Sequence, residues 1–190
     1  MFGGFQHHGH HGHGHHGHHH GHEHKDNQGF NQNQSQWGQQ MSWSPMQGAQ
    51  YKIISGLSSN MVLDVSQSQH DHNNLIIYEW NNGANQKFYF QPIGGNKFGI
   101  FSAKTHQTVE VPQGSQHNGT RIICSQANKQ VNEFWELVPA NFMGKPNAFY
   151  IKSFCGKALD VKGGQCQNEA HVIQWDYNGG NNQIWVIEQC

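Results

Sequence analysis

One arrangement of residues recurs three times after residue 50 and restricts the fold more than any other feature. Each copy opens on an apolar-acidic-apolar triplet and closes on an aromatic residue. The acidic residues are Asp64, Glu110 and Asp160. The closing aromatic residues are Phe88, Trp135 and Trp185. The acidic residues are 46 and 50 positions apart and the aromatic residues 47 and 50, so two independent landmarks keep one period. Such a period indicates a triplicated structural unit.

The same region alternates short apolar runs with turn residues. Runs such as Phe88-Tyr89-Phe90 and Trp185-Val186-Ile187 show the period of half-buried strands. Clusters such as Asn81-Asn82-Gly83 separate them, and no stretch has the spacing of an amphipathic helix. We expect an all-β domain over residues 50–190, with repeats at about 51–93, 97–139 and 149–190 and about twelve antiparallel strands.

Residues 1–49 differ in composition from the rest of the chain. Histidine and glycine dominate the first half, and glutamine, asparagine, glycine and serine follow. A segment with so little apolar surface cannot offset the entropy of ordering its backbone. We therefore expect a low-complexity, disordered tail.

The histidines of the tail allow three interpretations. They are His7, His8, His10, His11, His13, His15, His16, His18, His19, His20, His22 and His24. The tail is a flexible, soluble extension, in part an expression artefact; or its neutral imidazoles chelate zinc, nickel or copper without a fixed geometry. In the third interpretation, protonation of these side chains near pH 6.5 drives contact with anionic surfaces. The ordered domain itself requires no cofactor.

Composition limits which binding partners and which cellular compartment we expect for this protein. Only 12% of the residues are charged, the formal net charge is −1 and Arg121 is the single arginine, which argues against nucleic-acid binding. No signal peptide and no apolar run of about 18 residues is visible, so we expect no transmembrane segment. The four cysteines lack paired spacing and are expected to be reduced thiols. These features favour a cytoplasmic protein, with unconventional secretion left open.

The three repeats resemble the ricin-type β-trefoil family, the R-type lectins. The resemblance rests on the L-D-V triplets and on the closing Gln-x-Trp pattern, and it covers about 51–190. It implies a six-stranded barrel capped by six further strands, with Phe88, Trp135 and Trp185 in the shared core. It also implies a noncatalytic, carbohydrate-binding function directed at galactose-type or related glycans or glycoconjugates.

The resemblance further implies which residues bind the sugar. In repeat 3 they are Asp160, Trp175 and Asn182, with Gln183 beside them. In repeat 1 they are Asp64, Tyr78 and Asn85, with Gln86 beside them. A carboxylate accepts hydrogen bonds from adjacent hydroxyl groups, an amide adds a polar partner, and an aromatic ring covers the apolar face of a sugar.

Several positions depart from the family pattern. Repeat 2 has Glu110 for the aspartate, Cys124 for the aromatic residue and Glu133 for the glutamine, so we expect no sugar site there. A glutamine that many relatives place two residues before the aromatic residue is isoleucine in all three repeats, at Ile76, Ile122 and Ile173. Gln174 and Tyr177 are the candidates to compensate in repeat 3.

Alternatives to sugar binding remain at this stage. Asp64 and Asp160 could cap turns, because aspartate side chains bond nearby backbone amides. The chain would then be a protein- or membrane-surface adaptor with hisactophilin-like, pH-sensitive binding. No catalytic motif is present, and His70-Asp71-His72 is better explained as a polar loop than as a metal site. An outward-facing Trp175 beside Asp160 and Asn182 would favour the lectin.

Overall fold

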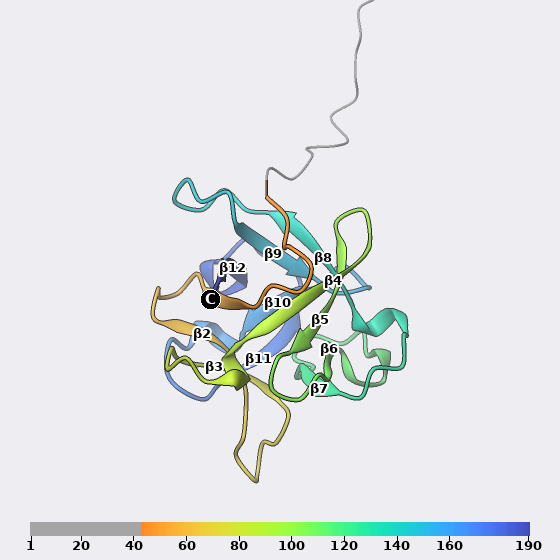
Figure 1. Ribbon diagram of the computed structural model, residues 1–190. Coiled ribbons are helices and arrows are strands. Elements are labelled where there is room, and N and C mark those ends of the chain that lie inside the picture. The colour runs from red at the N-terminus through yellow and green to blue at the C-terminus, as the bar shows by residue number, and fades with distance from the viewer. Residues whose placement is uncertain (1–42) are drawn as a thin grey trace, which may run out of the picture. The chain divides into compact units, whose positions relative to one another are not determined.

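The computed structural model describes residues 43–190, and within this range the fold is all-β (Figure 1). The twelve strands are β1 (Tyr51–Ser55), β2 (Met61–Val65), β3 (Leu75–Glu79), β4 (Phe88–Gly94), β5 (Lys97–Ser102), β6 (Thr108–Glu110), β7 (Ile123–Ser125), β8 (Phe134–Pro139), β9 (Ala148–Lys152), β10 (Ala158–Val161), β11 (Ala170–Trp175) and β12 (Ile184–Gln189). The 3₁₀ turns are η1 (Ala84–Gln86), η2 (Pro112–Gly114), η3 (Val131–Glu133), η4 (Lys162–Gly164) and η5 (Asn181–Gln183). The prediction of about twelve strands is confirmed.

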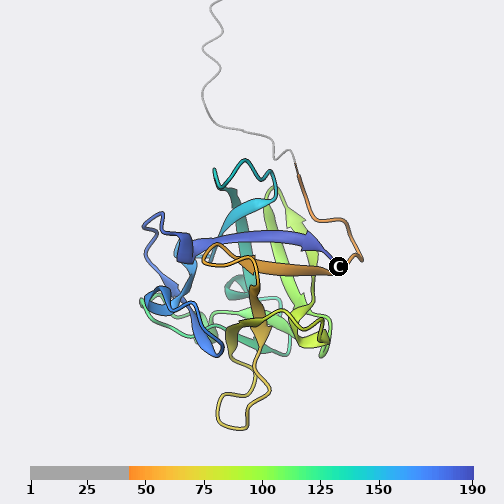
Figure 2. The ribbon, with the colours of Figure 1, turned by 90° about the vertical axis from the view of Figure 1, so that its left-hand side faces the viewer.

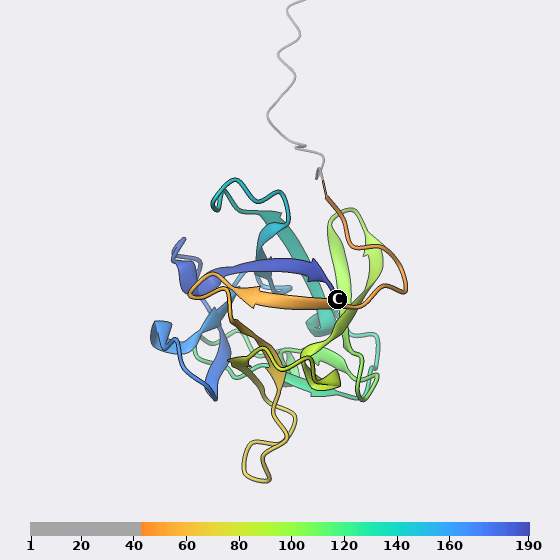
Figure 3. The same ribbon diagram turned by 60° about the vertical axis from the view of Figure 1, so that its left-hand side comes forward.

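Six strands close into a barrel. Antiparallel pairing runs from β1 to β12, β9, β8, β5 and β4, and β4 pairs with β1 again. Figures 2 and 3 show β1 and β12 side by side along one wall, joined by five paired positions from Tyr51↔Gln189 to Ser55↔Trp185. A closed ring of this kind leaves no exposed strand edge.

The other six strands form three hairpins, one in each repeat: β2–β3, β6–β7 and β10–β11. The hairpins also contact one another, since β3 pairs with β11 and single bridges join Asn74 to Ile123 and Arg121 to Ile173. A barrel capped by three hairpins is the β-trefoil that the family resemblance implied.

The closing aromatic residues lie in the core, as predicted. Phe88, Trp135 and Trp185 are completely buried. The indole N–H of Trp135 donates to the carbonyl of Val109 and that of Trp185 to the carbonyl of Leu159, both at 2.9 Å. A buried indole needs such a partner, because an unpaired polar group inside the protein is costly. In repeats 2 and 3 these bonds tie the end of the repeat to the triplet at its start.

The start of the described chain packs on the barrel. The Trp43 ring lies 5.9 Å from that of Tyr51 and 5.5 Å from that of Phe149, measured between ring centroids. The hydroxyl of Tyr51 accepts a bond of 2.7 Å from the amide of Met46. Residues 43–49, predicted to belong to the tail, therefore contact the domain in this structure. The rest of the predicted tail lies outside the described residues.

Composition also raised expectations about the cysteines and about membrane-spanning segments, and the structure bears on both within residues 43–190. Cys124, Cys155, Cys166 and Cys190 are all free thiols. Across the described range, 43–190, the structure contains no helix of the length and apolar character that membrane crossing requires.

Candidate functional site

The repeat 3 residues singled out from sequence meet at one cavity of about 340 Å³. Asp160 lies on β10 directly opposite Ile173 on β11, Trp175 ends β11, and Asn182 comes from η5. The cavity is lined by Asp160, Lys162, Gly163, Ile173, Trp175, Asn178 and Asn182. Short antiparallel strands bring the acid and the aromatic residue to one face, because paired residues point to the same side of a hairpin.

Two side-chain amides orient the Asp160 carboxylate. Asn182 Nδ2 and Gln183 Nε2 each donate to Asp160 Oδ2, and both bonds are 2.8 Å long. The second oxygen, Oδ1, accepts no hydrogen bond from the described residues. One oxygen of the carboxylate therefore remains available as an acceptor for a ligand.

Burial controls the charge of this group. Asp160 is almost fully buried, and loss of hydration raises the pKa of its carboxyl above the ordinary value. The hydrogen bonds from Gln183 and Asn182 favour the ionised form and lower the pKa, but they offset only part of the effect of burial. The acceptor is consequently a partly desolvated carboxylate, which forms stronger hydrogen bonds than one in water.

Trp175 stands at the rim of the cavity. Its side chain is 41% exposed, in contrast to the two tryptophans that close repeats 2 and 3. A loop from repeat 2 supports this edge: Asn118 Nδ2 donates to Asp176 Oδ2 at 2.8 Å, and the Asp176 amide donates to Asn118 Oδ1 at 3.0 Å. The amide of Gly119 also donates to the Gln174 carbonyl at 2.9 Å. The backbone on both sides of Trp175 is thus held in place, and its ring faces solvent next to Asp160 and Asn182.

Gln183 has a different position from that of its neighbour Asn182. It is completely buried, and it does not line the cavity. Its Nε2 also donates to the Asp176 carbonyl, and its Oε1 accepts from the Asn178 amide, both at 2.9 Å. Gln183 therefore positions Asp160 and the loop around it, and is not placed to contact a ligand.

Neither candidate for replacing the missing glutamine reaches the cavity. Gln174 is buried, and its Nε2 donates to the carbonyls of Ser115 at 2.7 Å and His117 at 3.1 Å. Tyr177 packs against Tyr150, with ring centroids 4.8 Å apart, and the Lys152 ammonium lies 4.6 Å from the centre of the Tyr177 ring. The floor of the cavity is therefore the apolar side chain of Ile173.

Repeat 1 repeats this arrangement with a smaller aromatic residue. Asn85 Nδ2 donates to Asp64 Oδ1 at 2.8 Å, and Tyr78 is half-buried at the edge of a cavity of about 290 Å³. Gln86 is buried and binds the loop, donating to the Glu79 carbonyl at 2.9 Å. Burial raises the pKa of Asp64, and bonds from Asn85 and Gln86 together with the charge of Lys104 lower it in part.

Repeat 2 retains the hydrogen-bonded polar side chains of the site but lacks its aromatic residue. Asn132 Nδ2 donates to Glu110 Oε2 at 3.2 Å, as the other asparagines do to their aspartates. Glu133 accepts two backbone N–H bonds, from Asn128 at 2.6 Å and Lys129 at 2.8 Å, and so holds the same loop as the glutamines. Cys124 is 1% exposed, and burial raises its pKa to about 12, so it offers no stacking surface and no thiolate.

Sequence reasoning did not identify one polar cluster, where the hairpins meet. Arg121 NH1 lies 2.5 Å from Asp71 Oδ1, and His171 Nε2 lies 3.2 Å from Asp71 Oδ2. The second guanidinium nitrogen of Arg121 bonds His171 Nδ1 at 3.1 Å. Asp71 thus serves as an ion-pair partner, and within 43–190 no three His, Cys, Asp or Glu side chains converge as a metal site. The histidines of the tail lie outside the described residues.

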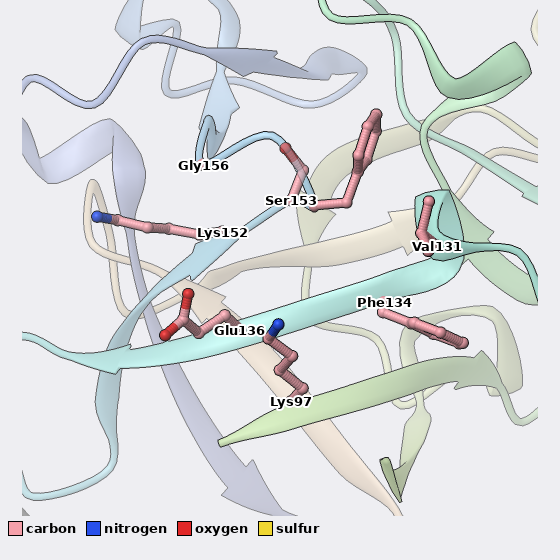
Figure 4. Close-up of a pocket in the computed structure, with 8 residues that line it drawn as sticks. Lys97, Val131, Phe134, Glu136, Lys152, Ser153 and Gly156 are labelled. Atoms are coloured by element: carbon pink, nitrogen blue, oxygen red, sulfur yellow. The ribbon is translucent and has the colours of Figure 1, made fainter. Parts of the chain in front are cut away.

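A further cavity of about 380 Å³ lies on the barrel wall (Figure 4). Lys97, Glu136 and Lys152 occupy opposed positions on the adjacent strands β5, β8 and β9, and Val131 and Phe134 add apolar surface. Its lining includes none of the residues predicted to bind sugar.

Comparisons with known proteins agree with this fold. A model of the family described as ricin-type beta-trefoil lectin domain-like matches residues 33–125. The designed three-fold symmetric protein ThreeFoil is 27% identical with a TM-score of 0.66, and the match covers 73% of this chain and 96% of that one. None of the curated proteins compared with the chain matches it significantly.

Two natural proteins show the same fold. The ricin B-like lectin of Macrolepiota procera, solved in complex with lactose, is 25% identical with a TM-score of 0.65, over 78% of this chain and all (100%) of that one. An exo-β-1,3-galactanase from Clostridium thermocellum is 24% identical with a TM-score of 0.68, over 77% of this chain but only 31% of the enzyme. The resemblance inferred from the repeats is confirmed: the model of the ricin-type lectin-like family matches this chain over part of its length, and solved ricin B-like lectins share its β-trefoil fold.

Proposed function

We propose that the domain is a noncatalytic lectin module that binds neutral, galactose-type glycans through repeat 3 and repeat 1. The observation that carries the proposal is the outward-facing ring of Trp175, which shares a cavity with Asp160 and Asn182. Large exposed aromatic residues next to oriented polar groups are typical of binding sites.

The repeat 3 cavity supplies complementary chemistry for a sugar ring. Asp160 Oδ1 accepts a bond from a sugar hydroxyl, while Oδ2 stays held by Asn182 and Gln183. Trp175 covers the C–H face of the ring, and Ile173 contacts its apolar part from below. Because the amides already orient the carboxylate, little side-chain entropy is lost when the sugar binds.

The two functional repeats differ in strength in this proposal. The Tyr78 ring is smaller than an indole and more buried, so repeat 1 presents less stacking surface than repeat 3. Repeat 2, with the buried Cys124 in the aromatic position, does not bind. Two weak sites on one domain favour multivalent glycans, because the second contact becomes intramolecular.

The proposal of a noncatalytic domain also rests on the repeat 3 cavity. Glycoside hydrolysis generally uses a pair of carboxyl groups on either side of the scissile bond. Among the residues that line this cavity, Asp160 is the single carboxylate. Its hydrogen bonds from two amides suit a fixed acceptor of hydroxyl protons.

Calorimetric titration of the full chain with lactose tests the proposal. The variants Asp160→Ala and Asp64→Ala should each remove one site, and the double variant should show no heat of binding. Thermal unfolding of each variant controls for loss of the fold. Unchanged binding of lactose by a folded double variant would refute sugar recognition by these repeats.

A further inference from the structure

A second cavity lies against the repeat 1 site. It has a volume of about 530 Å³, and its walls include the Arg121–Asp71–His171 cluster and the exposed side chains of Gln165 and Gln167. Asp71 belongs to the loop between β2 and β3, which projects from the domain in Figures 1 to 3. This cavity therefore draws on all three repeats.

The two cavities share part of their walls. Ser66, Ser68, Ile76 and Glu169 line both the 290 Å³ cavity that contains Asp64 and the 530 Å³ cavity beside it. The repeat 3 cavity shares no lining residue with either. Repeat 1 thus opens into a longer groove, whereas repeat 3 is a separate site.

Strand pairing sets the direction and length of the groove. Asp64 on β2 is paired with Ile76 on β3, and Ile76 is paired with His171 on β11. Paired residues share one face of a sheet, so these three side chains form a row across three strands. Two strand spacings amount to about 10 Å, which is longer than one hexose ring.

The chemistry of the extension suits hydroxyl groups. The side-chain amides of Gln165 and Gln167 are exposed and make no hydrogen bond to the described residues. The Glu169 carboxylate, on the wall common to both cavities, has no ion-pair partner among residues 43–190. Arg121 is already paired with Asp71, so it is not a free cation for an anionic ligand. Uncommitted amides and a carboxylate match neutral, hydroxyl-rich ligands.

We infer that the repeat 1 site is the first part of an extended groove that binds a neutral oligosaccharide over at least two consecutive sugar rings. The first ring lies at Asp64 and Tyr78, and the chain continues over Ile76 and Glu169 toward Gln167 and His171. Repeat 3 binds a single sugar ring. This inference rests on the sugar-binding function proposed above and adds the length and charge of the ligand.

The test uses the full chain with Asp160→Ala, so that only repeat 1 contributes. Galactose, lactose and the neutral tetrasaccharide lacto-N-neotetraose are titrated by calorimetry. The tetrasaccharide should bind about tenfold more tightly than galactose, since a few added hydrogen bonds give such a gain. In the Gln165→Ala/Gln167→Ala background the gain should fall to about twofold, with galactose affinity unchanged.

The matched control is the full chain with Asp64→Ala, which leaves only repeat 3. There the tetrasaccharide and lactose should bind with affinities within about twofold of each other. A sialylated lactose should bind repeat 1 more weakly than the neutral tetrasaccharide, because Asp64 and Glu169 repel an anion while Arg121 is already paired with Asp71.

The possible outcomes distinguish failure of the extended groove from failure of the proposed lectin function. Equal affinity of repeat 1 for galactose and the tetrasaccharide, with both binding, overturns the extended groove and leaves the lectin function standing. A chain-length gain that survives the double glutamine variant also overturns it. Absence of binding for every sugar in the wild-type chain overturns the proposed function and this inference with it.

Discussion

Removal of the Trp175 ring is the most direct perturbation of the repeat 3 site. With roughly 250 Å² for a tryptophan side chain, the 41% exposed fraction leaves about 100 Å² in contact with solvent. A sugar face that covers half of this surface removes about 50 Å² from water on the ring and a similar area on itself. At about 25 cal/mol per Å², the contact contributes about 2.5 kcal/mol.

Trp175→Ala should therefore weaken lactose binding at repeat 3 by about 50-fold, since each 1.4 kcal/mol is about tenfold. The assay is calorimetric titration in the Asp64→Ala background, where repeat 3 is the site that remains. The matched control is Tyr177→Ala: Tyr177 lies two residues after Trp175 and is 50% exposed, but it does not line the cavity. The control variant should bind lactose as its parent does.

Thermal unfolding separates binding from stability in this experiment. Trp175 lies on the surface, so its removal should shift the unfolding temperature by only a few degrees. If Trp175→Ala binds lactose like its parent, or if Tyr177→Ala weakens binding as strongly, then the indole is not the stacking surface and the reasoning fails.

Four further predictions follow from other parts of the structure. Gly180→Ala should weaken lactose binding at repeat 3 at least tenfold, because a Cβ there would lie 2.5 Å from Asn182 Oδ1 and displace the amide that holds Asp160. Asp160→Asn should abolish binding at repeat 3 yet raise the unfolding temperature at pH 7, as judged by calorimetry. The sign follows from the raised pKa of Asp160: the fold disfavours its ionised form, so stability falls as pH rises through the ordinary value toward the raised one, and a neutral amide removes that cost. Lactose affinity should also decline as the pH falls through the raised pKa of Asp160, because the carboxylate that accepts the sugar hydroxyl becomes protonated. As a control, Glu110→Ala titrated with lactose at pH 7 should bind as wild type does. Removal of residues 1–42 should abolish retention of the chain on a nickel-charged resin and any pH-6-dependent sedimentation with anionic liposomes; equal retention with and without them would contradict metal binding by the tail.

The fold could be predicted because its signal is repeated. A single acidic triplet or a single closing aromatic residue is weak, but three of each at one period require three equivalent units. Burial of Trp135 and Trp185 follows from the same pattern, since each indole bonds back to its own triplet. Each of these contacts joins two residues of the same repeat, so the regular spacing of the motifs in the sequence indicates it.

The candidate site was predictable at the level of residue types but not of roles. Asn182 and Gln183 are neighbours, yet one lines the cavity and the other is buried beneath it. The reason is the 3₁₀ turn η5, in which successive side chains point about 120° apart. Spacing alone could not decide which of the two faces a ligand.

The groove beside repeat 1 could not be predicted from the sequence either, and the reason is a different one. Asp71, Arg121 and His171 come from three repeats and meet where the hairpins converge. The three positions hold three different residue types, so no recurring motif marks the cluster. The position of Asp71 also depends on the path of the long loop between β2 and β3, which the equivalent repeats do not reproduce.

The pairing of β1 with β12 has a consequence for how the protein is made. Tyr51 and Gln189 are opposed in the barrel although they are separated by almost the whole domain in sequence. During synthesis β1 leaves the ribosome first and must wait for β12 before the ring can close. Until then β1 and β9 each present an unpaired edge on which another nascent chain can add. Folding should accordingly be slow, as it is for proteins dominated by long-range contacts, and most vulnerable to misassembly in the interval before β12 has left the ribosome.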